Sequence, residues 1–278
     1  MSEGEVVDPR DLEDVVEIDA TVAHSARMYD YLLGGSTNFE VDRAAVDRAT
    51  AAVGGIDNAR TAARANRAFL RRAVRYLAGE AGVRQFLDIG TGIPDSDGWH
   101  ADPQQIASDA RVVYVDNDPI VLAHAHKLLT STAEGAAAYI DGDLRDPEGL
   151  LGRAKETLDL SHPVAVVLAA VLHLVPDRDD PHGVVARLID ALPAGSYLAV
   201  SHLTSEVLPR EVGELAGHLE RAAEGAFVTR DLGDIRRFFE GLEIIEPGVV
   251  PVEHWRPDEA QAKPRWLSST YGGVGRKG

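Results

Sequence analysis

The chain has 278 residues, and its 45 acidic against 28 basic residues give a net charge of −17 at neutral pH. Such a charge repels phosphate backbones and anionic lipid surfaces, so we expect neither nucleic acid nor a membrane as a partner. The absence of cysteine excludes disulfides, thiolate nucleophiles and zinc sites built on cysteine, and it fits a reducing cytoplasm.

The first twenty residues carry eight acidic side chains against the single Arg10, and they lack the basic start and apolar stretch of a signal peptide. The longest apolar run, residues 164–172, is well short of the roughly 20 residues that cross a bilayer. We therefore expect residues 1–20 to form a disordered acidic leader and the protein to be cytoplasmic.

Residues 21–80 form a helical region by their pattern. The segment is rich in alanine, and three or so helices precede any strand. The pairs Gly34–Gly35 and Gly54–Gly55 interrupt the pattern, as glycines at helix ends do.

Residues 81–278 follow the pattern of an α/β protein, in which short apolar runs alternate with amphipathic segments. Strands are expected at 85–89, 111–115, 136–140, 164–170 and 196–201, with helices at about 100–109, 118–130, 147–157 and 181–192. Helices at 207–222 and 231–240 then lead to short strands near 243–253 and 265–271. The prediction is a doubly wound, mostly parallel seven-stranded sheet with an antiparallel C-terminal edge, and a ligand at the carboxyl ends of the parallel strands.

The tips of the first two predicted strands indicate a nucleoside-type ligand. The first strand leads through Asp88 into Gly90 and Gly92, where glycines let the backbone approach a ligand. Asp116 and Asn117 follow the second strand, and a carboxylate there can accept both hydroxyls of a ribose. A plain strand-to-helix turn is the alternative for the glycine loop alone.

The third strand is followed by Asp143 and Leu144. The Asp143 carboxylate can accept from the exocyclic amine of an adenine, and the Leu144 amide can donate to the ring. Asp143 could instead begin the next helix, but Asp146 is better placed for that role because Pro147 then takes the first helical position.

The ligand could be a dinucleotide or S-adenosylmethionine. A dinucleotide loop needs a third small residue where this chain has Asp95, and Asp97 lies just beyond. Two carboxylates would repel a pyrophosphate, whereas S-adenosylmethionine carries a sulfonium cation and no phosphate. The pattern therefore favours S-adenosylmethionine, with an NAD-dependent oxidoreductase as the weaker alternative.

The same loops belong to a longer set of motifs, at residues 26–35, 38–39, 42–43, 64–69, 88–94, 115–119, 143–147 and 271–277. In these motifs the sequence resembles a family of S-adenosylmethionine-dependent methyltransferases from actinomycetes, once catalogued as a domain of unknown function. The similarity runs from about Asp19 to the end. It implies a class I methyltransferase fold and binding of S-adenosylmethionine through Gly90, Asp116 and Asp143, and it specifies no acceptor.

Two positions depart from the family pattern. Many relatives have lysine after the glycine pair where this chain has Ser36–Thr37, and a His-Glu pair survives here only as His100 followed by Ala101. These losses motivate a second hypothesis, in which the protein binds the cofactor as a sensor or partner without catalysis.

His173, at the end of the fourth strand, is the candidate for a catalytic base, because that edge of the sheet should lie near the reacting methyl group. The alternative is a half-buried histidine whose polar atoms are satisfied. His100, His124 and His126 are weaker candidates. The spacing of the last two disfavours a shared metal, and Asp177, Asp179 and Asp180 are interpreted as a solvated loop. We expect no metal site.

Five arginines form one stripe of the helix around residues 59–76, namely Arg60, Arg64, Arg67, Arg71 and Arg75. One of them could bind the carboxylate of the cofactor, with Arg64 as our choice, or the stripe could hold an acidic acceptor. A solvated face paired with nearby acids is the alternative.

The first helix could be a lid that closes over the cofactor and builds the acceptor pocket, with Arg27, Tyr29, Tyr31 and Asn38 as candidate substrate contacts. It could also be an ordinary helix whose tyrosines pack on the sheet. We favour the lid, because a methyltransferase sheet alone leaves its acceptor side open. The prediction as a whole is a methyltransferase that acts on an oxygen or nitrogen atom of a small molecule.

Overall fold

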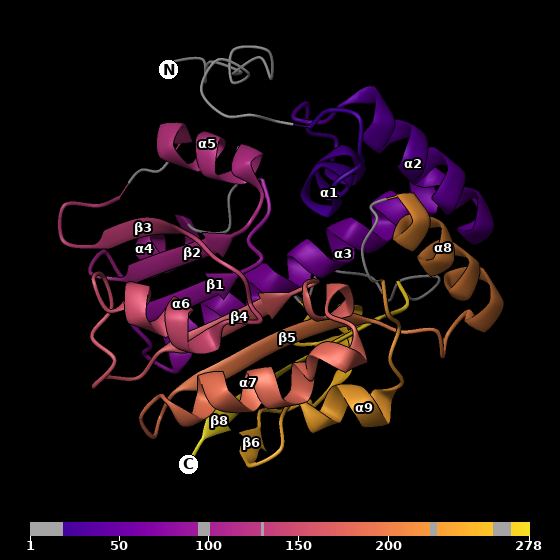
Figure 1. Ribbon diagram of the computed structural model, residues 1–278. Helices are drawn as coiled ribbons and strands as arrows, with labels where there is room; N and C mark the ends of the chain where they lie inside the picture. The colour runs from indigo at the N-terminus through magenta and orange to yellow at the C-terminus, as the bar shows by residue number, and fades with distance from the viewer. Residues whose placement is uncertain (1–18, 94–100, 129–130, 223–226, 258–267) are drawn as a thin grey trace.

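A sheet of five parallel strands with an antiparallel edge lies at the centre of the computed structural model, which describes residues 19–93, 101–128, 131–222, 227–257 and 268–278 (Figure 1). The parallel strands are β1 (Gln85–Ile89), β2 (Arg111–Asp116), β3 (Ala136–Asp141), β4 (Ala165–Ala169) and β5 (Tyr197–Leu203). The antiparallel strands are β6 (Leu242–Ile244), β7 (Val250–Pro251) and β8 (Thr270–Lys277). The strand order is β3-β2-β1-β4-β5-β8-β6, with β7 paired to β8, and this confirms the predicted fold class.

The antiparallel edge differs in detail from the prediction. The part of the chain that the structure describes holds eight strands and not seven, because the segment expected near 243–253 is divided into β6 and β7. Pro247 has no amide hydrogen, and Gly248 adopts a φ of +95°, so neither continues a ladder. The last strand begins at Thr270, later than expected.

Strand β8 is rich in glycine, so its sequence lacks the run of apolar side chains that predicts a buried strand. A β-carbon on Gly272 would lie 2.8 Å from Cζ of Phe69, and one on Gly275 would lie 2.9 Å from Cδ1 of Phe239. The aromatic rings therefore pack directly on the strand backbone, and larger residues do not fit there.

Alternate side chains of the strands enter two hydrophobic cores, one on each face of the sheet. Leu87 and Val166 point into the first core, while their neighbours Phe86 and Val167 point into the second. This burial of both faces is the reason that the parallel strands are apolar throughout.

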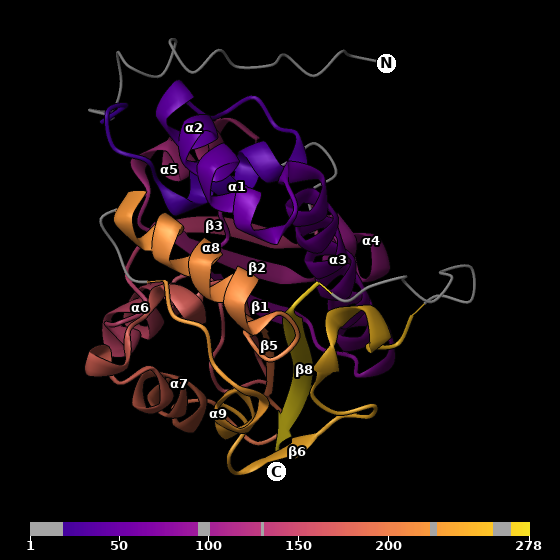
Figure 2. The same ribbon diagram turned by 90° about the vertical axis from the view of Figure 1, so that its right-hand side faces the viewer.

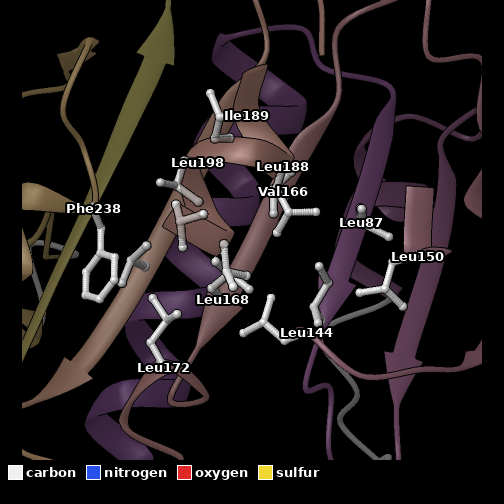
Figure 3. Close-up of a cluster of buried hydrophobic side chains, with 14 of the residues drawn as sticks. Leu87, Leu144, Leu150, Val166, Leu168, Leu172, Leu188, Ile189, Leu198 and Phe238 are labelled. Atoms are coloured by element: carbon white, nitrogen blue, oxygen red, sulfur yellow. The ribbon is translucent and has the colours of Figure 1, made fainter. Parts of the chain in front are cut away.

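The first core is covered by α6 (Pro147–Ala154), α7 (Pro181–Asp190) and α9 (Leu232–Arg237). Figure 3 shows side chains of the strands and of α6 and α7 meeting there, among them Leu87, Leu150, Val166 and Leu188, together with Phe238, which follows α9. Asp146 accepts a hydrogen bond from the Gly149 amide at 3.1 Å and caps α6, as predicted.

The second core is covered by α3 (Ile56–Arg75), the π-helical turn η3 (Tyr76–Glu80) and the short helix η6 (Val252–His254). α4 (Ala101–Ile106) follows β1, and α5 (Pro119–Leu128) follows β2. In Figure 2, α3 and α4 lie on one side of the sheet and α6, α7 and α9 on the other.

The N-terminal helices are α1 (Ser25–Leu33), α2 (Glu40–Thr50), the 3-10 turn η2 (Ala51–Val53) and α3. Gly34 ends α1 with a φ of +90°, and Gly54 ends η2 with a φ of +84°. The prediction that both glycine pairs stop helices is confirmed. The expected leader falls almost wholly outside the described residues.

Helix α8 (Pro209–Ala222) belongs in sequence to the C-terminal part of the chain, but it packs on the N-terminal helices beside α2 and η2 (Figures 1 and 2). Leu219 and Ala222 of α8 join Met28 and Val46 in one hydrophobic cluster. The helices at this end of the sheet therefore come from both ends of the sequence. Within the described ranges, no helix is long and apolar enough to cross a membrane.

Candidate functional site

A cavity of about 650 Å³ lies at the carboxyl ends of β1, β2 and β4, where the sequence predicts a ligand. The strand tips line one part of it, and residues of α1, α2, η2, α3 and α8 line much of the rest. Its volume falls in the range of pockets that enclose small organic ligands.

The loop after β1 is held close to β2 by its glycines. Gly90 has a φ of +74°, and a β-carbon there would lie 2.4 Å from Cγ2 of Val171, so only glycine fits. The Gly90 amide donates to the Val115 oxygen at 2.8 Å. Gly92 has a φ of +69°, with open space beside it on the cavity wall.

Asp116 ends β2 with its side chain 6% exposed. Its carboxylate accepts from the Gly92 amide at 2.8 Å and from the Asp118 amide at 3.0 Å. Burial raises the pKa of Asp116, and these two hydrogen bonds oppose that shift. The exposed Asn117 lies next to it on the wall.

Asp88, Asp116 and Arg67 are the charged residues in the described lining, and the charge of each acts on the Tyr139 phenol. Burial and the charge of Asp88 raise the pKa of Tyr139, while the Thr91 hydroxyl and the charge of Arg67 act against that rise. Two of these three charged residues, Asp88 and Asp116, belong to β1 and β2, and the third belongs to α3.

Within the arginine stripe, the residue that lines the cavity differs from the predicted Arg64. Arg64 is exposed and lies outside the lining, whereas Arg67 lines the cavity. The two residues are three positions apart, so the rotation of α3 about its axis decides between them.

Asp143 and Leu144 also lie outside the lining of this cavity. Arg145 binds both carboxylate oxygens of Asp143 and lowers its pKa, and Leu144 is buried in the first core. A ligand of Asp143 would therefore share or displace the Arg145 pair, and the role of Asp143 stays a prediction.

His173 lies in the short helix η4 (Leu172–Leu174) directly after β4, and it lines the cavity. Its ring meets His202 edge to face at 5.6 Å and lies over Phe227 at 4.7 Å. Burial and then the charge of Arg230 lower the pKa of His173 to about 4, so the ring is neutral at neutral pH. Nδ1 is buried with no hydrogen-bonding partner in the described part of the chain, unlike the satisfied histidine of the alternative interpretation.

Arg230 fixes the loop that carries His173. Its guanidinium donates to the backbone oxygens of Leu172 at 3.0 Å and Val175 at 2.9 Å, and it pairs with the Asp177 carboxylate. The sequence holds no local signal for this contact, because Arg230 follows Leu172 by 58 residues.

Tyr29 is the only one of the four residues predicted for the lid that lines the cavity. Its hydroxyl donates to the Ala63 oxygen at 3.2 Å and accepts from Nδ2 of Asn66 at 3.0 Å. Asn66 also lines the cavity, is 5% exposed, and has an Oδ1 atom without a hydrogen-bonding partner in the described ranges. Asn66 lies within the motif at residues 64–69, but the sequence pattern assigned it no role.

Arg27, Tyr31 and Asn38 lie outside the lining and stabilise the N-terminal helices instead. Their hydrogen-bond acceptors are, in that order, the Asp19 and Val22 backbone oxygens, the Asp47 carboxylate, and the Asp30 carboxylate with the Gly35 oxygen.

His24 connects the start of α1 to the loop after β2. Its Nδ1 lies 2.7 Å from Oδ2 of Asp118. Burial disfavours the charged ring, but the hydrogen bond and charge of Asp118 outweigh it and raise the pKa of His24. The same bond lowers the pKa of Asp118 against its own burial.

The described residues contain no group of three or more His, Asp and Glu side chains placed to share a metal ion. Asp177, Asp179 and Asp180 have protein partners, which are Arg230, Arg145 and the Gly183 amide. Asp95, Asp97 and His100 lie outside the described residues, and so do the side chains of His124 and His126.

Residues 12–278 match a family model described as S-adenosyl methyltransferase. A DUF574 family protein from Streptomyces avermitilis is 45% identical, with a TM-score of 0.89, and the match covers 94% of this chain and 99% of that one. A candidate methyltransferase from Thermobifida fusca is 39% identical, with a TM-score of 0.84 and coverages of 93% and 96%.

An O-methyltransferase family protein from Burkholderia thailandensis, 14% identical over 80% of this chain and 58% of that one, has a TM-score of 0.50 and shares the fold alone. A comparison with curated proteins finds no match.

Proposed function

Because the chain belongs to the S-adenosyl methyltransferase family, we propose that it transfers a methyl group from S-adenosylmethionine to an oxygen or nitrogen atom of a small molecule. The observation that carries this proposal is one cavity in which the tips of β1 and β2 and the His173 ring share a wall.

The strand tips fit the nucleoside part of the cofactor. Asp116 keeps lone pairs beyond those used by the Gly92 and Asp118 amides, and these can accept ribose hydroxyls. The open space beside Gly92 allows a ligand to approach the backbone, and Asn117 offers a further amide. Asp88 adds negative charge next to this wall, which suits a cationic cofactor.

We assign the carboxylate of the cofactor to Arg67 in place of Arg64, because Arg67 lies on the cavity wall. We retain Asp143 and Leu144 as contacts for the adenine. An adenine amine bound there would compete with Arg145 for the Asp143 carboxylate.

When bound, S-adenosylmethionine supplies a methyl group on a positively charged sulfur, open to in-line attack. Enclosure by α1, α3 and α8 excludes water and holds the acceptor in place. The neutral His173 ring can accept the proton that an acceptor hydroxyl or amine loses. A pKa of about 4 makes it a weak base, so we expect positioning and desolvation to provide most of the acceleration.

Titration calorimetry with S-adenosylmethionine, S-adenosylhomocysteine and NAD tests the proposal. We expect the first two to bind and NAD to give no heat. Binding of NAD without the other two would overturn the assignment of the cofactor. Cofactor binding without methyl transfer to any member of a metabolite library would favour the sensor hypothesis instead.

A further inference from the structure

The cavity has two chemically different parts. The described lining holds three charged side chains, of which Asp88 and Asp116 belong to β1 and β2 and Arg67 belongs to α3. Apart from Arg67, the helical residues of the lining are uncharged. The cofactor proposed above occupies the charged part, so the helical part remains for the acceptor.

Helix α8 presents an apolar face to this helical part. Val212, Leu215 and Leu219 lie at spacings of three and four along the helix, and all three line the cavity together with Leu208. The two arginines and three glutamates of α8 lie elsewhere, since none of them is in the lining. A ligand that contacts this face of α8 therefore meets apolar side chains and no charged side chain with which it could form an ion pair.

The lining residues of the N-terminal helices include further apolar side chains. α1 contributes Met28 and Leu32, and α2 with η2 contributes Val46 and Val53. Leu219 of α8 packs in the same hydrophobic cluster as Met28 and Val46, so the two sets of side chains form one apolar chamber. We name it the apolar chamber, defined by these residues together with Leu208, Val212, Leu215 and Leu219.

Most helical residues of the lining are apolar, and the polar ones, such as Ser25, Thr50 and Asn58, carry uncharged groups apart from Arg67. Oδ1 of Asn66 and Nδ1 of His173 are buried on the wall, and neither has a hydrogen-bonding partner in the part of the chain that the structure describes. A buried polar atom of this kind is stabilised by a ligand that bonds to it. The chamber thus suits a ligand with one or two polar groups on an apolar body.

We propose that the acceptor is an uncharged, largely apolar small molecule that carries a hydroxyl group, with its hydrocarbon in the apolar chamber and its hydroxyl toward His173. This inference rests on the proposed function and adds the class of substrate. A carboxylate or phosphate on the acceptor would lose its hydration against leucine and valine side chains, and the described lining has no spare cation there to replace it. Apolar surface, by contrast, gains free energy on entering the chamber.

The test compares matched probes on the full chain saturated with S-adenosylhomocysteine. Naphthol is paired with hydroxynaphthoate, and propylphenol with hydroxyphenylpropionate, so that each pair differs chiefly by a carboxylate. Calorimetry should show the neutral member binding roughly tenfold or more tightly in each pair. Equal or tighter binding of the carboxylates, or no binding of either neutral probe at its solubility limit, would overturn the inference.

A substitution on α8 tests whether the probes bind in the apolar chamber. Leu215→Lys should weaken naphthol binding about tenfold and tighten hydroxynaphthoate binding, because it supplies the missing cation. His218→Lys adds the same charge at an exposed position of the same helix and should change neither. Unchanged affinities in Leu215→Lys would contradict the location.

The same titrations separate this inference from the proposed function. If S-adenosylhomocysteine fails to bind the wild-type chain, the proposed function is wrong. If it binds and the carboxylate probes are preferred, only the class of acceptor is wrong.

Discussion

Asp116 is the residue on which the proposed cofactor site depends most, because its buried carboxylate faces the cavity from the tip of β2. We expect Asp116→Ala to weaken S-adenosylhomocysteine binding by about 1–3 kcal/mol, since the ribose hydroxyls lose their acceptor. Calorimetry measures the loss. Asp141→Ala is the control, because Asp141 is opposite Asp116 in register but exposed and outside the lining. An unchanged affinity in Asp116→Ala would remove this carboxylate from the site.

His173 should contribute to turnover and little to cofactor affinity. With an identified acceptor, His173→Ala should lower kcat about a hundredfold, the lower end of general-base effects, because a base with a pKa of about 4 is weak. Only the neutral ring accepts a proton, so wild-type kcat should fall as the pH drops through about 4. His162→Ala, at an exposed histidine, should behave as wild type. Full turnover in His173→Ala would refute the assignment of His173 as the catalytic base.

At the scale of elements, His24 ties α1 to the loop after β2, and this tie should depend on pH. The raised pKa of His24 means that its contribution to stability is complete below the ordinary value of 6.5 and is lost as the pH rises through the folded value. The lowered pKa of Asp118 means that its contribution is complete above 3.8 and is lost at lower pH. The pair should stabilise the fold most between these values.

The measurement is the free energy of unfolding of wild type and His24→Ala as a function of pH. The difference should be about 1 kcal/mol or less, because the His24 side chain is 38% exposed, and it should shrink above pH 6.5. His162→Ala, which breaks the exposed His162–Asp159 pair, is the matched control. A difference that grows with rising pH would contradict the assignment.

Strand β8 holds helix α7 through its last lysine. Nζ of Lys277 donates to the backbone oxygens of Ile189 at 2.9 Å, Asp190 at 3.1 Å and Leu192 at 2.7 Å. Lys277→Met should lower the free energy of unfolding by about 1–2 kcal/mol, because the last carbonyls of the helix lose their donor. Denaturant unfolding measures the effect, with the exposed Lys155→Met as control. If the two variants are equally stable, water must hydrogen-bond to the three backbone oxygens as well as Lys277 does, and the prediction is wrong.

For the whole molecule, binding in a cavity walled by both ends of the chain should stabilise the entire fold. S-adenosylhomocysteine at a hundredfold excess over its Kd should raise the free energy of unfolding by about 2.7 kcal/mol, and the melting temperature with it. NAD should give no shift. In Asp116→Ala the shift in melting temperature at the same ligand concentration should be smaller. A shift of equal size would mean that the ligand stabilises the protein without using the Asp116 carboxylate.

Local patterns allowed much of this molecule to be predicted. The apolar runs identified the parallel strands because a strand buried on both faces must be apolar throughout, and the glycine pairs located helix ends because only glycine adopts the left-handed conformation easily. The motifs identified the family and its cofactor, and the match over residues 12–278 confirms both. Cytoplasmic location, the domain boundaries and the absence of nucleic acid remain predictions.

The sequence by itself therefore determined the sheet, the strand tips that line the cavity and the family, because each depends on residues close together in the chain. Only the tertiary structure decided that Arg67 and not Arg64 faces the cavity, that Arg230 holds the loop of His173, and that α8 completes the walls. These outcomes depend on helix rotation and on packing between distant segments, and no spacing within one segment specifies either.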